Sequence, residues 1–373
     1  MASVFQNSRR SAWLPLDSNI FGPPRHWSGT AAYCASHGME WREVVPAGPV
    51  TRQPPRCVNY PAQRMIARVA QTLPAAGVAS LENARVVTPH GWIIASDDTF
   101  LPDHCWYGSE RDECPIYRYQ DLSPVTHLQG TTLTLASDWP ANYAHMLFDG
   151  LSRTSLFEGA GYSWGDVAHV LVPDLGSEGR RTAAQLCGLP MDRIVAAESF
   201  SVVQCDRLIA PTFPGVRRNT PPWVASFWRS HVSNHPKGKR RLFISRRGFS
   251  RNITNEDAIE SVLASCGFET IVSSDRSVRH HYSDAEIIVG AHGAALGDVV
   301  FCAPGAVLIE LTPPDHVYPY FYTAADSARM VYYSILGSYD GRKCDNPMTA
   351  DFSVDPELLR ATIGAVELEL QKA

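Results

Sequence analysis

A glycine-rich turn between two apolar runs has the composition of a phosphate-binding turn. Residues 286–311 read EIIVGAHGAALGDVVFCAPGAVLIEL. Glycine lets the backbone turn tightly from a strand into a helix and lets a phosphate approach the amides, and a helix N-terminus favours negative charge. Glu310 ends the second run, where a carboxylate could accept hydrogen bonds from ribose hydroxyls. Alternatively, the glycines only permit close packing, Glu310 is a solvated acid, and His292 caps the helix instead of binding phosphate.

An arginine-rich segment follows an apolar run at 241–245. Its arginines are Arg246, Arg247 and Arg251. Arginine suits a pyrophosphate because its planar fork donates two parallel charged hydrogen bonds. Residues that directly follow a parallel strand lie at the carboxyl edge of the sheet, where open α/β folds bind ligands. Asn255 and Glu256 then open a predicted helix. The alternative is a solvated basic turn paired with Glu256 and Asp257.

A third segment, NYAHMLFDGLSR, contains a histidine and a carboxylate that lie four residues apart. On a helix, His145 and Asp149 share one face. Either side chain could take a proton from a sugar hydroxyl if its pKa is suitable. The alternative reading is an ordinary surface pair between Asp149 and Arg153, with His145 as a core residue. An aromatic run from His316 to Tyr322 could stack on a sugar or base, or simply pack.

Alternating strand and helix patterns predict the elements that position these segments. A helix of about 18 residues is expected to begin near Asp138, and short Ile/Val-rich strands alternate with helices in the second half. The proline-rich segment 210–223 is the predicted linker. We therefore expect an α/β protein with an N-terminal domain at 1–215, a Rossmann-like domain at 216–350 and a C-terminal helix at 351–373.

Composition restricts the class of protein. The 33 basic and 38 acidic residues are not segregated into blocks, which argues against nucleic acid as a partner. Nine cysteines without a CxxC pair suit a reducing compartment, with pairing or metal binding by Cys105 and Cys114 as the alternative. The N-terminus lacks the apolar run of a secretory signal, and no 18-residue apolar stretch occurs. The expectation is a cytoplasmic protein; peripheral membrane association and the oligomeric state stay open.

The order of the three segments resembles glycosyltransferase family 61. The segments are Asn142 to Arg153, Ser245 to Glu256 and Gly290 to Leu296. The resemblance implies a GT-B-like fold, in which two Rossmann-like domains face each other across a cleft, and an inverting transfer that needs no metal or cofactor. The sequence contains no D-x-D triplet, the usual metal-binding carboxylates of such enzymes, so arginines and a helix dipole would have to balance the charge of the phosphates. Ala144, Ser152 and the Gly297-Asp298 pair depart from the family pattern.

The resulting hypothesis is a bacterial glycosyltransferase that uses a nucleotide sugar, with UDP favoured, and a glycan or glycoconjugate acceptor. Asp149 is the favoured base, and His145 orients the acceptor or a phosphate. The residues assigned to the donor are Arg246, Arg251, Asn255, His292, Gly293, Ala294 and Glu310. A silent nucleotide-sugar-binding or glycan-binding module and an NAD-dependent oxidoreductase are the alternatives. The donor sugar, the base and the acceptor are not specified by the sequence.

Overall fold

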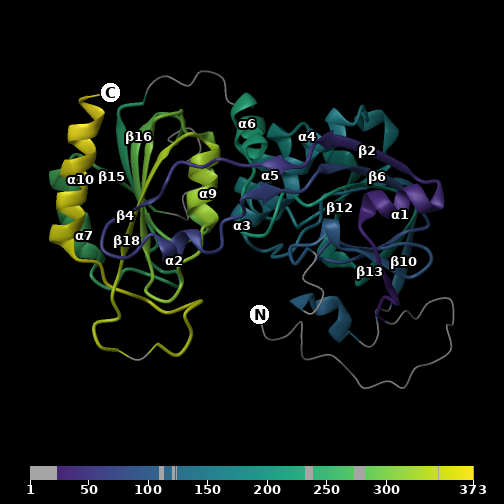
Figure 1. The fold of residues 1–373 in the computed structure, drawn as a ribbon, viewed down its shortest axis with the longest axis horizontal. Helices are drawn as coiled ribbons and strands as arrows, with labels where there is room; N and C mark the ends of the chain where they lie inside the picture. Colours follow the sequence, from purple (N-terminus) through teal and green to yellow (C-terminus); the bar gives the residue numbers. More distant parts are fainter. Residues whose placement is uncertain are drawn as a thin grey trace. The chain divides into compact units, whose positions relative to one another are not determined.

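The chain divides into two compact units in the computed structural model. The structure describes residues 23–108, 113–119, 122, 124–231, 238–272, 282–342 and 344–372. Unit 1 comprises Met1–Gly48 and Thr72–Arg217, and unit 2 comprises Pro49–Gln71 and Arg218–Ala373 (Figure 1). The chain passes from unit 1 to unit 2 within the proline-rich segment 210–223. The earlier excursion of residues 49–71 into unit 2 was not foreseen from the sequence.

Unit 2 contains a six-stranded sheet in which every neighbouring pair is parallel. Its order is β15-β14-β16-β17-β18-β4. The strands are β4 (Arg56–Cys57), β14 (Arg240–Ser245), β15 (Glu269–Val272), β16 (Ala285–Ala291), β17 (Val307–Thr312) and β18 (Val331–Leu336). If the strands are numbered along the chain from β14, the five strands β15, β14, β16, β17 and β18 lie in the order 2-1-3-4-5. The winding direction therefore reverses between β14 and β16. Such a switch point opens a crevice at the carboxyl ends of the two strands.

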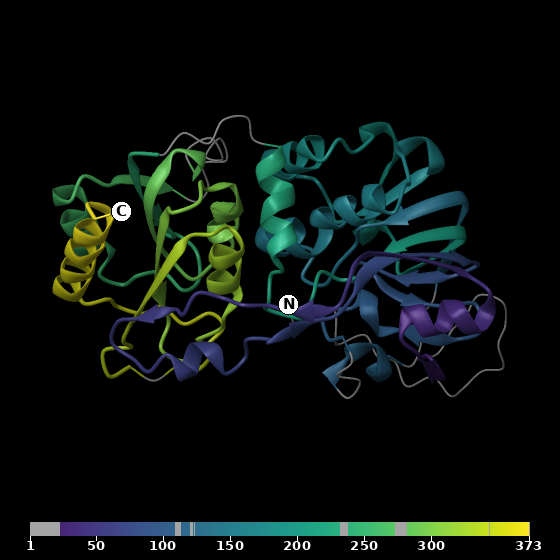
Figure 2. The same cartoon turned by 45° about the horizontal axis from the view of Figure 1, so that its top comes forward.

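Helices cover both faces of this sheet, which explains why its strands are apolar almost throughout. Helices α7 (Glu256–Ser265) and α10 (Pro356–Leu370) lie together on one face (Figures 1 and 2). Alternate strand residues such as Val289 and Ile309 pack there against Ile363 of α10. Helix α9 lies on the opposite face, where it contacts α6 and the 3₁₀ helix η9. Their bounds are α6 (Pro222–Ser230), η9 (Ala294–Phe301) and α9 (Tyr320–Ser327).

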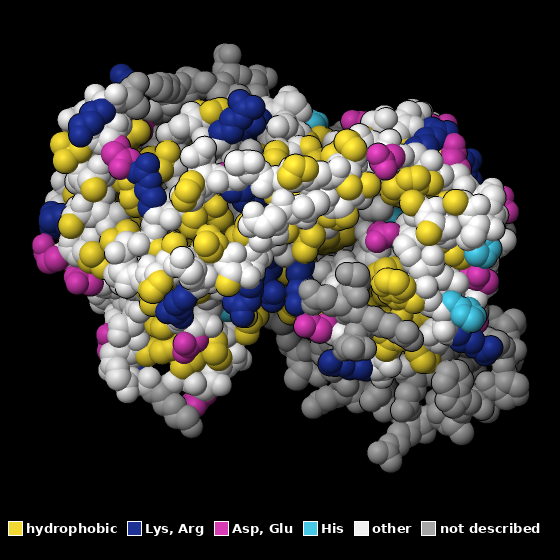
Figure 3. All heavy atoms as spheres, in the orientation of Figure 1, with side chains coloured by type: hydrophobic (Ala, Val, Ile, Leu, Met, Phe, Trp, Pro, Cys, Tyr) yellow, Lys and Arg dark blue, Asp and Glu magenta, His cyan; other side chains and the backbone are white. Residues whose placement is uncertain are grey.

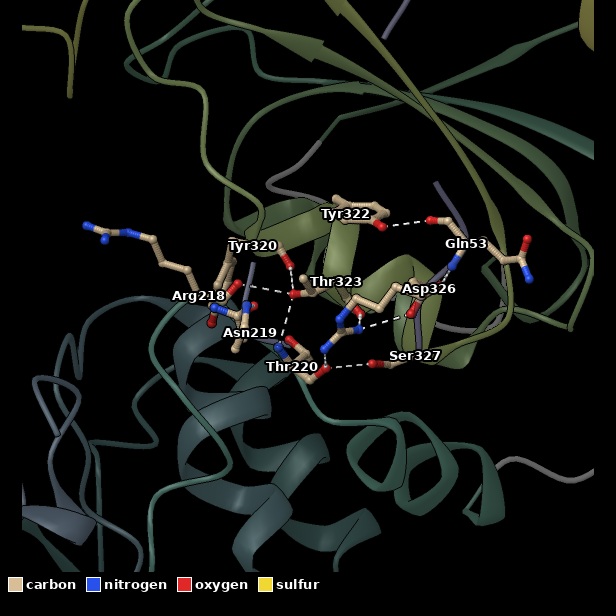
Figure 4. Close-up of polar contacts among 11 residues, drawn as sticks. Gln53, Arg218, Asn219, Thr220, Tyr320, Tyr322, Thr323, Asp326 and Ser327 are labelled. Atoms are coloured by element: carbon tan, nitrogen blue, oxygen red, sulfur yellow. Dashed lines mark hydrogen bonds and ion pairs between the residues drawn. The ribbon is translucent and has the colours of Figure 1, made fainter. Parts of the chain in front are cut away.

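The segment 49–71 is held in unit 2 by a strand and by a polar network. Strand β4 pairs with β18 at the sheet edge. The Arg52 guanidinium donates to Asp326 at 3.0 Å and to the Thr220 carbonyl at 2.8 Å, and the Tyr322 hydroxyl donates to the Gln53 carbonyl at 2.6 Å (Figure 4). Both places where the chain enters unit 2 are thereby fastened to α9.

Unit 1 contains a mixed ten-stranded sheet, unlike the all-parallel sheet of unit 2. Its order is β1-β9-β8-β7-β13-β10-β11-β12, with β6 also on β13 and β2 on β6. Strands β13, β10, β11 and β12 run parallel, whereas β6 and β7 pair antiparallel with β13. The strands are β1 (His26–Trp27), β2 (Glu40–Val45), β6 (Ala76–Glu82), β7 (Arg85–Val87), β8 (Trp92–Ile94), β9 (Thr99–Leu101), β10 (Val125–Thr134), β11 (His169–Val172), β12 (Ile194–Ala196) and β13 (Val202–Pro211).

The remaining elements are short. They are β3 (Gly48–Pro49), β5 (Thr72–Leu73), α1 (Thr30–His37), α2 (Gln63–Ile66), α3 (Tyr143–His145), α4 (Thr154–Gly159), α5 (Glu178–Leu186), the π-helical turn η4 (Met146–Gly150), and the 3₁₀ turns η1 (Pro102–His104), η3 (Pro115–Arg118), η5 (Leu151–Arg153), η6 (Trp164–Asp166), η7 (Met191–Arg193) and η8 (Ala197–Ser199). The mixture of sheets and helices confirms the α/β class. No described helix is long and apolar enough to cross a membrane.

The predicted helix from Asp138 to Gly159 begins later and is less regular than expected. Asp138 is not its N-cap, because its carboxylate is buried and accepts from Trp92 and Trp106. Asn142 caps the helix instead, accepting from the backbone of Ala144. The sequence also favours a weak helix centred on 277–282, and this segment falls almost entirely outside the described residues.

Candidate active site

Two predicted donor residues follow the strands that flank the switch point of unit 2. Arg246 comes directly after β14, and His292 comes directly after β16. The two strands are hydrogen-bonded neighbours, with Ile244 in register with Gly290. The topology therefore brings the arginine segment and the glycine turn to one crevice, where open α/β sheets bind ligands.

The Arg246 side chain lies over the glycine turn. It is 7% exposed, and its guanidinium donates to the Ser250 carbonyl at 2.8 Å. A Cβ atom placed on Gly293 would lie 1.6 Å from Nη1 of Arg246, so only glycine leaves room for this approach. Burial lowers the pKa of Arg246 to about 10, with a further contribution from nearby Arg251. Among the described residues, no carboxylate lies within ion-pair distance of Arg246.

Arg251 reaches the same turn from the other end of the arginine segment. Its Nε donates to the His292 carbonyl at 3.1 Å, and its Nη1 donates to the Met348 carbonyl at 2.7 Å. Its backbone has a φ of 57°, which is unusual for a residue other than glycine. Burial lowers its pKa. Within the described chain, neither buried Arg246 nor half-buried Arg251 has an ion-pair partner, so their two positive charges could be balanced by an anionic ligand.

Glu310 lies beneath the glycine turn instead of at an open strand end. It is fully buried; its Oε1 is hydrogen-bonded to Nδ1 of His292 at 2.5 Å, and its Oε2 accepts from the Tyr332 hydroxyl at 2.6 Å. Burial raises its pKa to about 8. A ribose contact needs an exposed carboxylate oxygen, which this environment does not provide. The geometry instead makes Glu310 a residue that fixes the ring orientation and tautomer of His292.

The remaining sequence-selected residues of unit 2 have structural contacts. The Asn255 side chain exchanges two hydrogen bonds with the backbone of Val354, at 2.7 and 3.1 Å, and so fastens the start of α7. Ala294 opens η9 after Gly293. Arg247 is half-exposed and pairs with Glu256 at 3.6 Å and Asp257 at 2.8 Å, as in the basic-turn alternative considered for this segment, and also with Glu260 at 3.1 Å.

His316, the first residue of the aromatic run considered for stacking, lies next to His292, and two arginines that were not assigned to the site lie beside the same run. The His316 ring contacts the His292 ring edge-on at 4.7 Å, and burial lowers its pKa to about 2. Tyr318 contacts His316. The guanidinium groups of Arg218 and Arg68 lie over the Tyr318 ring, 4.3 and 4.9 Å from its centre. Arg68 belongs to the 49–71 excursion, a contact between distant segments that no local pattern indicates.

On the face shown in Figure 3, Lys and Arg side chains occur in separate groups, with acidic side chains among them, and do not form one continuous band. No such band for a long polyanion is seen on this face.

In unit 1, His145 and Asp149 form a hydrogen-bonded pair. Nδ1 of His145 donates to Oδ2 of Asp149 at 2.6 Å. The Asp149 side chain is 7% exposed and the His145 side chain 12%. Burial raises the pKa of Asp149, against the opposing effect of His145. A buried carboxylate that orients an imidazole is the arrangement by which a histidine is prepared to take a proton at its other nitrogen.

A π-helical turn and a buried arginine hold this pair in place. Residues Met146–Gly150 form the turn, and such turns occur frequently at functional sites. Arg153 is 1% exposed and donates to the carbonyls of Ala136, Gly150 and Pro211. Ala136 and Pro211 lie at the carboxyl ends of the parallel neighbours β10 and β13. Arg153 is therefore a buried anchor and not the surface partner of Asp149.

Aromatic side chains surround His145. The Trp106 ring meets the His145 ring edge-on at 4.6 Å, and the Trp139 ring is stacked at 6.1 Å. Buried Asp138 accepts from the backbone of Trp106 and from the Trp92 indole, both at 3.0 Å, and so helps to place Trp106. Asp138 was considered only as a helix cap, and its role depends on contacts distant in sequence.

Cys105 and Cys114 lie together in the core of unit 1, but their sulfur atoms are 3.7 Å apart and both thiols are free. A disulfide needs a separation of about 2.05 Å. The described residues contain no group of three or more His, Cys, Asp or Glu side chains arranged to hold a metal ion.

Comparison with known proteins gives a family match over the part of the chain that carries all three segments. Residues 143–309 match the model of the family described as Glycosyltransferase 61. An alpha-1,3-arabinosyltransferase of Oryza sativa subsp. japonica is 35% identical over 88 residues, which is 22% of this chain and 15% of that protein. A xylan glycosyltransferase of Arabidopsis thaliana is 29% identical over 93 residues, which is 23% of this chain and 19% of that protein.

The alignments span less than a fifth of either relative, and both relatives come from plants, so they lend no support to the bacterial branch. The family match nevertheless begins one residue after Asn142 and ends one residue before Glu310. Over residues 143–309, the sequence is therefore similar to that of the glycosyltransferase 61 family.

Proposed function

We propose that this protein is a glycosyltransferase that moves a sugar from a nucleotide-sugar donor, with a UDP-sugar favoured, to a hydroxyl of a glycan or glycoconjugate. The family match over residues 143–309 supports the reaction class. The observation that carries the proposal is the convergence of two guanidinium groups, those of buried Arg246 and half-buried Arg251, on the glycine turn without a carboxylate ion-pair partner among the described residues.

Unit 2 is assigned the donor. Arg246, Arg251 and the amides at the start of η9 would bind the diphosphate, and Nε2 of His292 would donate to a phosphate oxygen while Nδ1 is held by Glu310. These groups would stabilise the negative charge that develops on the departing nucleoside diphosphate. Because fixed positive groups can supply this stabilisation, the proposed transfer does not need a divalent metal.

Unit 1 is assigned the acceptor. The geometry favours His145 as the base and Asp149 as the residue that orients it, which reverses the preference drawn from the sequence. Nδ1 of His145 is already committed to Asp149, and Nε2 would take the proton of the attacking hydroxyl. Direct attack on the anomeric carbon would invert its configuration. This division of roles is the one expected of a GT-B-like enzyme.

The oxidoreductase alternative loses its main support. That hypothesis rested on Glu310 as a ribose-binding acid at an open strand end, whereas Glu310 is fully buried and engaged by His292 and Tyr332. Only a measurement of turnover distinguishes a catalytically silent binding module from an enzyme.

A binding and turnover experiment tests the proposal. Thermal shifts would be measured with UDP, GDP, CDP, TDP and NAD, in buffer with EDTA and in buffer with Mg²⁺. We expect a nucleoside diphosphate to stabilise the protein in EDTA, and Arg246→Ala with Arg251→Ala to abolish the shift. Hydrolysis or transfer of the matching nucleotide sugar would then be followed by mass spectrometry. Stabilisation by NAD alone would contradict the proposal, and binding without turnover on any acceptor glycan would favour the silent module.

A further inference from the structure

The loop that follows β17 carries aromatic and cationic side chains beside the proposed diphosphate site. It comprises residues 313–319 and leaves the sheet at the same carboxyl edge as the residues that follow β14 and β16, because the three strands are parallel. The ring of His316 contacts the ring of His292 at 4.7 Å, and the ring of Tyr318 contacts that of His316 at 4.7 Å. A continuous run of ring contacts therefore leads from His292 to Tyr318.

Two arginines from distant parts of unit 2 lie over the Tyr318 ring. The guanidinium of Arg218 is 4.3 Å from the ring centre, and that of Arg68 is 4.9 Å from it. Because both groups lie over one ring, two like charges are held near each other, an arrangement that a bound anion would stabilise. The Arg68 guanidinium donates to the Val317 carbonyl at 3.4 Å, and no carboxylate of the described residues lies within ion-pair distance of it.

The three side chains present surface to solvent. Arg68 is exposed, and Arg218 and Tyr318 are partly exposed. The Arg218 backbone has a φ of 64°, and its carbonyl accepts from the Thr323 hydroxyl of α9 at 3.1 Å. Figure 4 shows the Arg218 side chain extending away from the labelled residues of α9. A fixed backbone therefore directs this guanidinium away from the helix, where a ligand can reach it.

His316 lies close to both groups of arginines. Burial lowers its pKa to about 2, and the positive charges of His292, Arg251 and Arg218 contribute to the low value. Arg251, which is assigned to the diphosphate, and Arg218 thus act on one buried and neutral ring. A ligand that extends from the diphosphate site to Arg218 would meet positive charge at both places.

The charge of these arginines restricts the ligand. Guanidinium groups bind carboxylates and phosphates through charged hydrogen bonds. The diphosphate of the donor is assigned to Arg246 and Arg251, and the base and ribose of a nucleoside diphosphate are uncharged at neutral pH. The remaining part of a nucleotide sugar that can carry a negative charge is the sugar itself, as a hexuronic acid. That sugar is bonded to the diphosphate, just as the loop adjoins His292.

We propose that Arg68 and Arg218, which lie over Tyr318, bind the carboxylate of a hexuronic acid in the donor. The inference rests on the proposed function and deepens it, because it names the class of sugar that is transferred. It also gives Tyr318 a role, which is to position two guanidinium groups instead of stacking on a sugar. Arg68, His316 and Tyr318 lie outside the matched residues 143–309, so the preference is assigned to this chain and not to its relatives.

The test compares acidic and neutral sugars on the same nucleotide. Dissociation constants would be measured by calorimetry in EDTA for UDP, UDP-glucose, UDP-glucuronate, UDP-galactose and UDP-galacturonate. If another nucleoside diphosphate binds in place of UDP, the same sugars would be prepared on that nucleotide. Charged hydrogen bonds to a carboxylate predict that at least one uronate binds about tenfold or more tightly than its neutral counterpart.

Variants of the two arginines should remove this preference. In Arg68→Gln, and in Arg68→Gln combined with Arg218→Gln, we expect the preference for the uronate to fall to within about threefold, with the Kd of UDP unchanged. An unchanged Kd of UDP also verifies that unit 2 is folded. Arg64→Gln is the matched control, because Arg64 belongs to the same excursion and donates to the Pro314 carbonyl of the same loop. It should retain the wild-type preference.

Three results would overturn the uronate assignment while leaving the proposed function intact. They are equal binding of acidic and neutral sugars by the wild-type protein, an equal loss of preference in Arg64→Gln, and an equal weakening of UDP and of every UDP-sugar in Arg68→Gln. The second would indicate a general positive field, and the third a contact with the diphosphate. Failure of every nucleoside diphosphate to bind would instead refute the proposed function itself.

Discussion

The guanidinium of Arg246 fills the space in which a side chain at position 293 would lie. The separation of 1.6 Å between a Cβ at Gly293 and Nη1 of Arg246 leaves no room for both. Gly293 has a φ of 171°, which any residue can adopt, so its backbone conformation does not require glycine. The glycine is needed for the close approach, and this links the arginine segment to the glycine turn.

Gly293→Ala should therefore fold but bind nucleotide poorly. Because the displaced group is the end of a flexible side chain, we expect a small change in Tm and a loss of nucleoside diphosphate affinity of about tenfold or more, measured by calorimetry. Gly364→Ala is the control, since no atom lies within 4 Å of a Cβ at that position of α10. It should raise stability by about 0.5 to 1 kcal/mol and leave affinity unchanged. Wild-type affinity in Gly293→Ala would refute the role given to Arg246.

Replacing Arg246 with methionine should stabilise the ligand-free protein. A buried charge without an opposite partner costs free energy, and Met keeps most of the apolar stem. We expect Arg246→Met to raise Tm in the absence of nucleotide and to weaken nucleotide binding at least tenfold. Arg247→Met, one residue away and half-exposed, should change stability by less than about 0.5 kcal/mol and keep its affinity. A large drop in Tm for Arg246→Met would mean that the arginine serves the fold and not a ligand.

Removing either member of the His145–Asp149 pair should slow transfer without affecting donor binding. We expect His145→Ala and Asp149→Asn each to lower kcat by about 10² to 10⁴, with the nucleotide Kd unchanged. The double variant should be hardly slower than His145→Ala alone, because the two side chains act as one unit. Transfer assays and calorimetry would be run on the same preparations. Near-normal kcat in His145→Ala, together with inactivity of Asp149→Asn, would restore Asp149 as the base.

Glu310 should make stability depend on pH. Burial raises its pKa from 4.5 to about 8 in the folded protein. Between these values the unfolded chain loses the Glu310 proton while the folded protein retains it, so stability contributed by this group is complete below pH 4.5 and is lost as the pH rises through about 8. Glu310→Gln cannot titrate. The difference in Tm, wild type minus Glu310→Gln, should therefore decline between pH 5 and pH 9. A constant or rising difference would contradict the raised pKa of Glu310.

Arg153 should be among the most important polar side chains for the stability of unit 1. Its loss leaves the buried carbonyls of Ala136, Gly150 and Pro211 without this donor. We expect Arg153→Ala to lower the free energy of unfolding by about 3 kcal/mol or more, measured by urea denaturation. Arg360→Ala, which removes an exposed ion pair with Glu357, should cost less than about 1 kcal/mol. Similar costs for the two variants would show that the carbonyl contacts of Arg153 matter little.

Sequence patterns predicted the parts of the fold that depend on local periodicity. The apolar runs around β14, β16 and β17 indicated buried parallel strands, and the helix expected within 351–373 is α10, which Asp355 caps. The chemical segments were found because each directly follows a strand or lies on one helical face. Their convergence in unit 2 follows from the parallel order of β14 and β16.

Features that depend on distant contacts were not predictable in this way. The environment of Glu310 is set by Tyr332 on the neighbouring strand, and that of Asp138 by Trp92 and Trp106. Spacing alone reports neither burial nor partners, so it placed Glu310 at an open edge and Asp138 at a helix start. The mixed sheet of unit 1 was missed for a related reason. The sequences of strands such as β6 and β13 do not indicate whether the strands pair parallel or antiparallel.

The excursion of residues 49–71 has a consequence for synthesis of the chain. Asn59 exchanges hydrogen bonds with the backbone of Leu336, a residue 277 positions later. A growing chain would therefore carry β4 without its neighbour until β18 has left the ribosome, and unit 2 cannot complete its sheet from its C-terminal residues alone. A fragment that starts at Arg218 would expose the edge of β18 along its backbone, the kind of unpaired edge at which polypeptides aggregate.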